Sequence, residues 1–209
     1  MTPEHKIRTA QTLSHIVTLA GILVMAGWIS GVGALTSISP VWIPMKFTTA
    51  FAFTLSGVLL YFIAEFIGGR TDAAQVVLPA AVLTILLLMG LMFFSHMLGA
   101  HTGLEDLFVV EKPGAVKTVV PGLPSLPTMI GFILISSGGI LAMFNFRGLR
   151  RAFKYIGLAV GALGAAAAAG YVLGIPGLYY FRPGVNSAMA FNTALLFVLL
   201  GTGFLCLSA

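Results

Sequence analysis

Charged residues are scarce in this sequence. Only 8% of its 209 residues are Asp, Glu, Lys or Arg, whereas 58% are hydrophobic, and the mean hydropathy is +1.04. Soluble domains contain about 25% charged residues, which cover much of their surface. The scarcity excludes a soluble globule and predicts an integral membrane protein. The net charge of +5 does not indicate nucleic-acid binding, because the basic residues are spread between apolar runs and form no polar face.

Residue types that perform chemistry are also few. Cys206 is the single cysteine, so no disulfide forms within the chain. The sequence has no GxSxG, HExxH, P-loop or GxGxxG-strand motif, and we predict that the protein is not an enzyme. His15 and His96 lie near opposite ends of their apolar runs, too far apart to bind one haem iron. We therefore expect no cofactor.

Six long apolar runs make up most of the chain. An α-helix needs about 20 apolar residues to cross the hydrocarbon core of a bilayer. The first run is long for a signal peptide and has no small-residue cleavage site, so we expect it to be retained. The sequence therefore predicts an all-α integral membrane protein with six transmembrane helices, over residues 13–35, 47–68, 76–98, 128–146, 155–173 and 189–208.

The basic residues predict the orientation of these spans. Short cytoplasmic segments are enriched in Lys and Arg, so both termini are predicted to be cytoplasmic and the three longer connections to face outward. The basic residues in short segments on the amino-terminal side are Lys6, Arg8, Arg70, Arg147, Arg150, Arg151 and Lys154. Those on the other side, in longer segments, are Lys46, Lys112, Lys117 and Arg182.

A short signature recurs where the second, fourth and sixth spans begin. A repeat on this scale indicates that each unit is one supersecondary element. We predict three helical hairpins in a pseudo-threefold bundle, within a single membrane domain over residues 1–209 whose units cover approximately 10–70, 74–147 and 152–209. The first copy is Met45, Thr48, Thr49, Ala50, Phe53, Leu55 and Gly57, and the third, at identical spacing, is Met189, Asn192, Thr193, Ala194, Phe197, Leu199 and Gly201. The weaker middle copy has Pro124, Thr128, Phe132, Leu134 and Ser136.

The polar residues of the signature are predicted to cap the returning helices. Asn and Thr side chains accept hydrogen bonds from the free N–H groups of a first helical turn. Glycines that follow the outgoing helices, Gly31, Gly99 and Gly174, are predicted to terminate them. The predicted capping residues are Thr48, Thr49, Thr128, Asn192 and Thr193.

The middle outer connection, residues 99–127, is the longest and the only outer one with acidic residues. Its H-x4-H-x3-E-D string is not a strong match to a helical metal site, because ligand pairs at i, i+3 or i, i+4 require a helix and this loop is not clearly helical, so we expect no metal site. His96 stands where the other units have Trp28 and Tyr171, a position typical of the interfacial aromatic belt. Because specific binding often resides in such loops, the ligand or partner candidates are His96, His101, Glu105 and Asp106.

Charged groups are also predicted at the cytoplasmic surface. Glu65 lies near the end of the second span and Arg70 follows it, which favours an ion pair or snorkelling side chains there. A basic cluster after the fourth span is a candidate for binding lipid headgroups or a partner, although orientation alone also explains it. Its members are Arg147, Arg150, Arg151 and Lys154.

Three segments carry a family resemblance: WISGVGALTSISPVWIPMKFTTAFAFTLSGVLLYF, LGAHTGLEDLF, and GYVLGIPGLYYF followed by MAFNTALLFVLLG. Over nearly the whole chain they resemble the amino-terminal membrane region of bacterial sensor histidine kinases and diguanylate cyclases. There the matching segments have a proline and Met followed by NTA and F-x-L-x-G, and a GID-x-LL loop. Asp106 and Leu107 match the Asp-Leu of that loop, whereas Pro127 and Thr128 depart from the family's Asn-Thr.

The resemblance implies a sensory input module of the bacterial inner membrane. Its relatives continue into PAS, kinase or cyclase domains, whereas this sequence ends at Ala209, so the output is expected from a separate protein or from a longer chain. A second hypothesis is an accessory subunit that packs in a larger membrane complex and contacts lipid, pigment or quinone. Both hypotheses remain open here, and both predict membrane lipids and a partner protein, not nucleic acid, as partners.

Overall fold

Helices form all the regular secondary structure in the described part of this computed structural model, residues 2–99, 103–111, 118, 120–180 and 187–208. Six of them are long and apolar enough to span a membrane, which confirms the predicted class. They are α1 (Pro3–Ser30), α3 (Phe47–Ile67), α4 (Ala74–Leu98), α5 (Leu126–Met143), α6 (Leu149–Leu173) and α7 (Phe191–Ser208). The short helices α2 (Gly33–Thr36), η1 (Leu104–Asp106) and η2 (Pro176–Leu178) lie in the connections.

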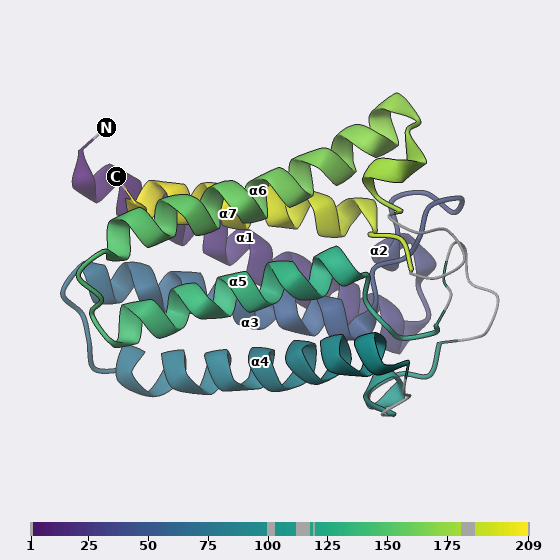
Figure 1. Cartoon of the computed structure of the whole chain (residues 1–209), viewed down its shortest axis with the longest axis horizontal. Coiled ribbons are helices and arrows are strands. Elements are labelled where there is room, and N and C mark those ends of the chain that lie inside the picture. Colours follow the sequence, from purple (N-terminus) through teal and green to yellow (C-terminus); the bar gives the residue numbers. More distant parts are fainter. Residues whose placement is uncertain (1, 100–102, 112–117, 119, 181–186, 209) are drawn as a thin grey trace.

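The six long helices lie side by side in one bundle (Figure 1). The start of α1 and the end of α7 lie at the same end, which we call the terminal end. The three longer connections, which contain α2, η1 and η2, lie at the opposite end, which we call the loop end.

Two helices extend beyond their predicted bounds at the terminal end. α1 begins at Pro3, where the Thr2 hydroxyl caps it by accepting the His5 N–H at 3.4 Å. α6 begins at Leu149, so its first turns contain arginines that were predicted to lie in a connection. Hydropathy locates only the apolar part of a helix, whereas backbone hydrogen bonding continues into the polar residues beside it.

The long helices form two tiers. In the most apolar stretches of α3, α5 and α7, 50 to 56% of residues are buried, against 28 to 39% in α1, α4 and α6. The returning helices α3, α5 and α7 therefore form the inner tier, and each outgoing helix packs on the returning helix that follows it. Large apolar side chains such as Leu23, Leu83 and Leu158 point outward from the outer tier, as lipid-facing residues do.

Three phenylalanines meet where the inner helices converge. Phe53 on α3, Phe132 on α5 and Phe197 on α7 hold the same position in the three signatures, and all three are fully buried. The ring centroid of Phe53 lies 4.7 Å from that of Phe132 and 5.0 Å from that of Phe197. The centroids of Phe132 and Phe197 are 5.2 Å apart. Edge and tilted contacts at these distances are favourable for aromatic rings. We call this group the phenylalanine trio.

Glycine ends each outgoing helix, as predicted. Gly31, Gly99 and Gly174 follow α1, α4 and α6 with φ values of 73°, 62° and 66°. This left-handed conformation carries no Cβ penalty in glycine, which explains why the helices stop there.

Glycine also sets the distance between paired helices. A Cβ on Gly57 would lie 2.7 Å from the Ser14 carbonyl oxygen of α1, and a Cβ on Gly201 would lie 2.7 Å from the Gly157 carbonyl oxygen of α6. The second would also lie 2.6 Å from the backbone nitrogen of Gly161. These neighbours are backbone atoms, so they cannot move aside as a flexible side chain can. The helices can approach this closely only because residues 57 and 201 are glycines.

We expect Gly201→Ala to lower the free energy of unfolding by about 2 kcal/mol, since α6 and α7 must separate to admit the methyl group. The matched control is Gly90→Ala in α4, where a Cβ meets no atom within 4 Å. That change is expected to be neutral or stabilising by up to about 1 kcal/mol through helix propensity. Denaturant unfolding in one detergent measures both, and equal losses would contradict the steric explanation.

Candidate functional site

A buried ion pair joins the start of α3 to the middle connection at the loop end. Lys46, which directly precedes α3, places Nζ 2.6 Å and 2.5 Å from the two carboxylate oxygens of Glu111. Nζ also donates to the Thr118 hydroxyl at 2.8 Å, so the three N–H bonds of the ammonium have three acceptors. Both charged residues are only 5% exposed. A pair so far from water is stable only when its polar atoms are satisfied, as they are here.

Further hydrogen bonds connect this pair to neighbouring groups. The backbone N–H of Gly122 donates to the Glu111 carboxylate at 2.7 Å, and the Thr48 hydroxyl donates to the Gly122 carbonyl at 3.3 Å. The space left beside the pair is about 10 Å³, enough for roughly one water molecule. We call Lys46, Glu111, Thr118 and Gly122 the loop-end clasp. It is a closed connection between two segments and has no room for a substrate.

The two clasp charges depend on each other. Burial lowers the pKa of Lys46 below its ordinary value, and the Glu111 carboxylate opposes this shift by favouring the ammonium form. Loss of the carboxylate would leave only the effect of burial. Glu111 therefore favours the charged form of Lys46 against the effect of burial.

A second polar cluster holds α3 at the terminal end. Glu65, in the last turn of α3, is 9% exposed and accepts hydrogen bonds from Gln11 of α1 and, at 2.7 Å, from Arg70. The predicted ion pair between Glu65 and Arg70 is thus confirmed. The Arg70 side chain is 73% exposed, so this pair contributes little by itself. The Gln11 bond, which the sequence did not predict, ties α3 to α1.

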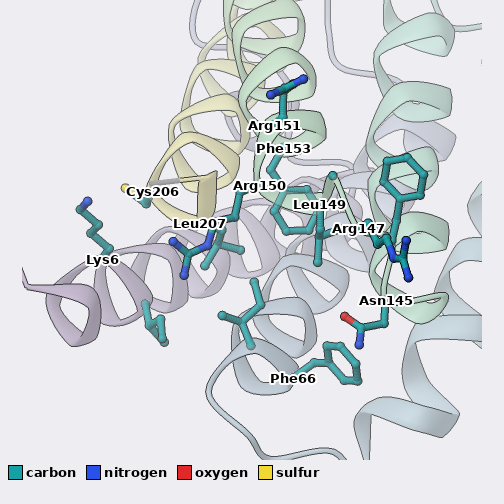
Figure 2. Close-up of a pocket in the computed structure, with 14 residues that line it drawn as sticks. Lys6, Phe66, Asn145, Arg147, Leu149, Arg150, Arg151, Phe153, Cys206 and Leu207 are labelled. Atoms are coloured by element: carbon teal, nitrogen blue, oxygen red, sulfur yellow. The ribbon is translucent and has the colours of Figure 1, made fainter.

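Three of the four predicted basic residues after α5 line a cavity at the terminal end. Arg147, Arg150 and Arg151 line it together with Lys6 of α1, whereas Lys154 is not among the residues that line it. Figure 2 shows how these side chains and the apolar ones beside them come from the ends of several helices.

The candidates of the middle connection are only partly described. His96 lies half-buried in the last turn of α4, and Asp106 is exposed at the end of η1. His101 and the side chain of Glu105 lie outside the described part of the chain. Among the residues that the structure describes, no three His, Cys, Asp or Glu side chains are grouped to hold a metal ion. The four residues remain predictions as ligand or partner contacts.

Other residues than the predicted ones hold the N-cap positions of the two returning helices whose starts are defined. Lys46 and Ser125 precede α3 and α5 as N-cap residues, and neither side chain caps the helix. Thr48 and Thr128 lie inside the first turns, and the Thr128 hydroxyl pairs with that of Ser125 at 2.7 Å. The hydrogen bonds that the structure gives to Thr48 and Thr128 thus go to groups other than the free N–H groups of the first turn.

The signature instead connects its helices to neighbouring segments. Thr48 bonds to the middle connection, as described above, and the Asn192 amide donates to the Thr36 carbonyl of α2 at 3.1 Å. Thr49 and Thr193 are both buried, 2% exposed. Thr48 and Asn192 therefore help to join one hairpin to the next.

Trp28 and Tyr171 form the same kind of bond in two hairpins. The Trp28 indole donates to the Met45 carbonyl at 2.8 Å, and the Tyr171 hydroxyl donates to the Met189 carbonyl at 2.8 Å. Sequence reasoning assigned these aromatics only to the interfacial belt. Met45 and Met189 hold the same position in the first and third copies of the signature. That equivalence is the feature of the sequence that could have indicated this contact.

Sequence reasoning also missed the loop-end clasp. Lys46 was predicted only as an orienting charge, Glu111 was one of the acidic residues of the middle connection without a predicted partner, and the two are 65 residues apart. The one local signal was the position of Lys46 directly after Met45 of the signature.

The fold defines the chain as a multi-pass, all-helical membrane protein with a closed polar clasp at one end and a basic cavity at the other. Comparison with family models, curated proteins and solved structures finds no match to this chain.

Proposed function

We propose that this protein is a non-catalytic input module of a signalling system in the inner membrane of a bacterial cell. In this arrangement the loop end faces outward and both termini are cytoplasmic. The distribution of basic residues supports the orientation, because the terminal end holds Lys6, Arg70 and the cluster from Arg147 to Lys154. The resemblance of the sequence to sensor kinase and cyclase membrane regions supports the function.

We also propose that the bundle consists of three equivalent helical hairpins with pseudo-threefold symmetry. The phenylalanine trio supports it, because one ring comes from each returning helix. The glycine ends of the three outgoing helices and the matched bonds of Trp28 and Tyr171 support it too. A bundle of like units meeting at one axis would transmit a displacement of one hairpin to the others through their shared packing.

The observation that carries the proposal is that α3 is held by polar contacts at both ends. Lys46 binds Glu111 of an outer connection, and Glu65 binds α1 and the connection to α4 at the terminal end. The helix between them is continuous and mostly buried. An outward signal that separates Lys46 from Glu111 would release one end of a rigid element whose other end lies at the cytoplasmic surface. The signal then reaches a partner output protein through residues 65–74.

The test is to release the loop-end clasp by Glu111→Gln, which removes the charge and keeps the shape. We expect amide hydrogen exchange in residues 65–74 to become roughly fivefold faster or more, the range of ordinary coupling energies. Exchange is measured by mass spectrometry on the full chain in lipid nanodiscs. The matched control is Asp106→Asn, which neutralises an exposed carboxylate of the same connection.

Residues 144–149, between α5 and α6, provide an internal reference at the same end. A general loss of stability would speed exchange in both segments, whereas release of α3 is expected to act on residues 65–74 first. If Glu111→Gln leaves residues 65–74 unchanged, the clasp only closes the fold and the input function loses its main support. The accessory-subunit hypothesis would then be favoured, with the bundle packing beside a larger membrane complex.

A further inference from the structure

A cavity at the terminal end has a volume of about 890 Å³. It lies between the start of α1, the ends of α3 and α7, and the segment from Asn145 to Phe153 that leads into α6. Apolar side chains, including Phe66, Phe153 and Leu207, line part of it. Figure 2 shows Phe66, Phe153 and Leu207 around the same space as the labelled basic side chains.

Four basic residues line the same cavity, and none of them has an acidic partner among the residues that the structure describes. They are Lys6, Arg147, Arg150 and Arg151, and no acidic residue is among the described residues that line it. In the described part of the chain, the ion pairs are those of Lys46 with Glu111 and of Arg70 with Glu65, so none of the four takes part in one.

The first turn of α6 adds to this positive potential. It contains no acidic residue, although acidic side chains are what favour a helix amino terminus. Arg150 and Arg151 lie in that turn, where the helix dipole opposes a positive charge. A bound anion would relieve the repulsion among these groups, and the arrangement is thus better suited to the bound state than to the empty one.

We propose that this cavity binds the phosphate-bearing headgroup of an anionic phospholipid. Arginine side chains suit phosphate because their planar guanidinium groups donate paired hydrogen bonds to its oxygens. The apolar residues lie where four membrane-spanning segments end, so they suit contact with the first carbons of acyl chains. A free inorganic ion has no apolar part that could pack against them. Basic pockets between transmembrane helices on the cytoplasmic side are known to accept such headgroups. This site does not depend on the signalling role.

The test compares lipids on the purified full chain in a mild non-ionic detergent. Native mass spectrometry measures the binding of phosphatidylglycerol and of phosphatidylcholine with the same acyl chains. We expect phosphatidylglycerol to bind roughly tenfold more tightly, because only its headgroup has a net negative charge. Equal binding of the two lipids in the unaltered protein would overturn the proposal without the use of any variant.

Paired variants separate a specific site from general surface attraction. The double variant Arg147→Gln/Arg150→Gln is expected to weaken phosphatidylglycerol binding roughly tenfold. The control Arg8→Gln/Lys154→Gln removes the same charge from exposed residues that do not line the cavity, and it should retain binding within about twofold. Arg147→Lys/Arg150→Lys keeps the charge and should bind at an intermediate level.

Equal losses in the two Gln variants would show diffuse attraction to the basic surface and overturn the site. Inorganic phosphate is the further probe. If millimolar phosphate displaces phosphatidylglycerol completely, the cavity is a site for a soluble anion and the lipid assignment is wrong. If it displaces the lipid only weakly, the acyl chains contribute to binding as proposed.

Discussion

Lys46→Met is expected to lower the free energy of unfolding by about 3–5 kcal/mol. The substitution leaves the Glu111 carboxylate 5% exposed and without its main partner. A buried, unpaired charge costs far more than the loss of one favourable contact, because it has neither water nor an opposite charge to stabilise it. The Gly122 N–H would be the one remaining donor that the structure gives to this carboxylate.

A double-mutant cycle tests this explanation. Glu111→Leu alone should be destabilising by a similar amount, whereas Lys46→Met/Glu111→Leu should recover most of the loss because neither charge is left buried. The recovery is expected to be incomplete, since Gly122 and Thr118 each lose one hydrogen bond in the double variant. Denaturant unfolding in micelles, followed by the fluorescence of Trp28 and Trp42, supplies the free energies.

Arg70→Gln is the matched control for the cycle. It removes the cation of the ion pair at the other end of α3, where the arginine side chain is 73% exposed. A loss of no more than about 1 kcal/mol is expected there. If the effects of Lys46→Met and Glu111→Leu simply add in the double variant, the two side chains do not stabilise the protein as a pair.

Phe132→Ala is expected to lower the free energy of unfolding by about 3 kcal/mol. Its ring is fully buried between those of Phe53 and Phe197, and its removal leaves a space that three separate helices would have to close. The value is at the lower end for a Phe→Ala change in a protein core, because a side chain released from the bundle meets lipid instead of water.

Phe144→Ala is the control for the phenylalanine trio. Phe144 directly follows α5, the helix that contains Phe132, and is 78% exposed. Its removal is expected to cost less than about 0.5 kcal/mol. Phe132→Leu, which fills part of the space, should fall between the two, and a loss as small as that of Phe144→Ala would show that the trio does not hold the helices together.

Features decided by neighbouring residues were predicted correctly from the sequence. The number of spans followed from run length and hydropathy, and Gly31, Gly99 and Gly174 end their helices as expected. The pair of Glu65 and Arg70 was also predictable, since the two residues are five apart on one short segment. In each case the energy involved is local, so the sequence pattern alone reveals it.

The role of the signature required the tertiary structure. From the sequence, Thr48 and Asn192 are equally suited to capping their own helix and to bonding with another segment. A side chain at the start of a helix can reach either kind of partner. The structure places the Gly122 and Thr36 carbonyls beside them, and those acceptors belong to other parts of the chain. Local propensity could not choose between the two partners.

What the sequence by itself determined is the all-helical membrane class, the six spans and the positions where the outgoing helices end. Only the tertiary structure decided the loop-end clasp and the contacts within the phenylalanine trio. It also decided that Lys6 and the arginines before and within α6 line one cavity. Hydropathy and helix termination act over a few consecutive residues. A contact between Lys46 and Glu111 exists only because separate hairpins pack together, and the energy of that packing is spread over many side chains at once.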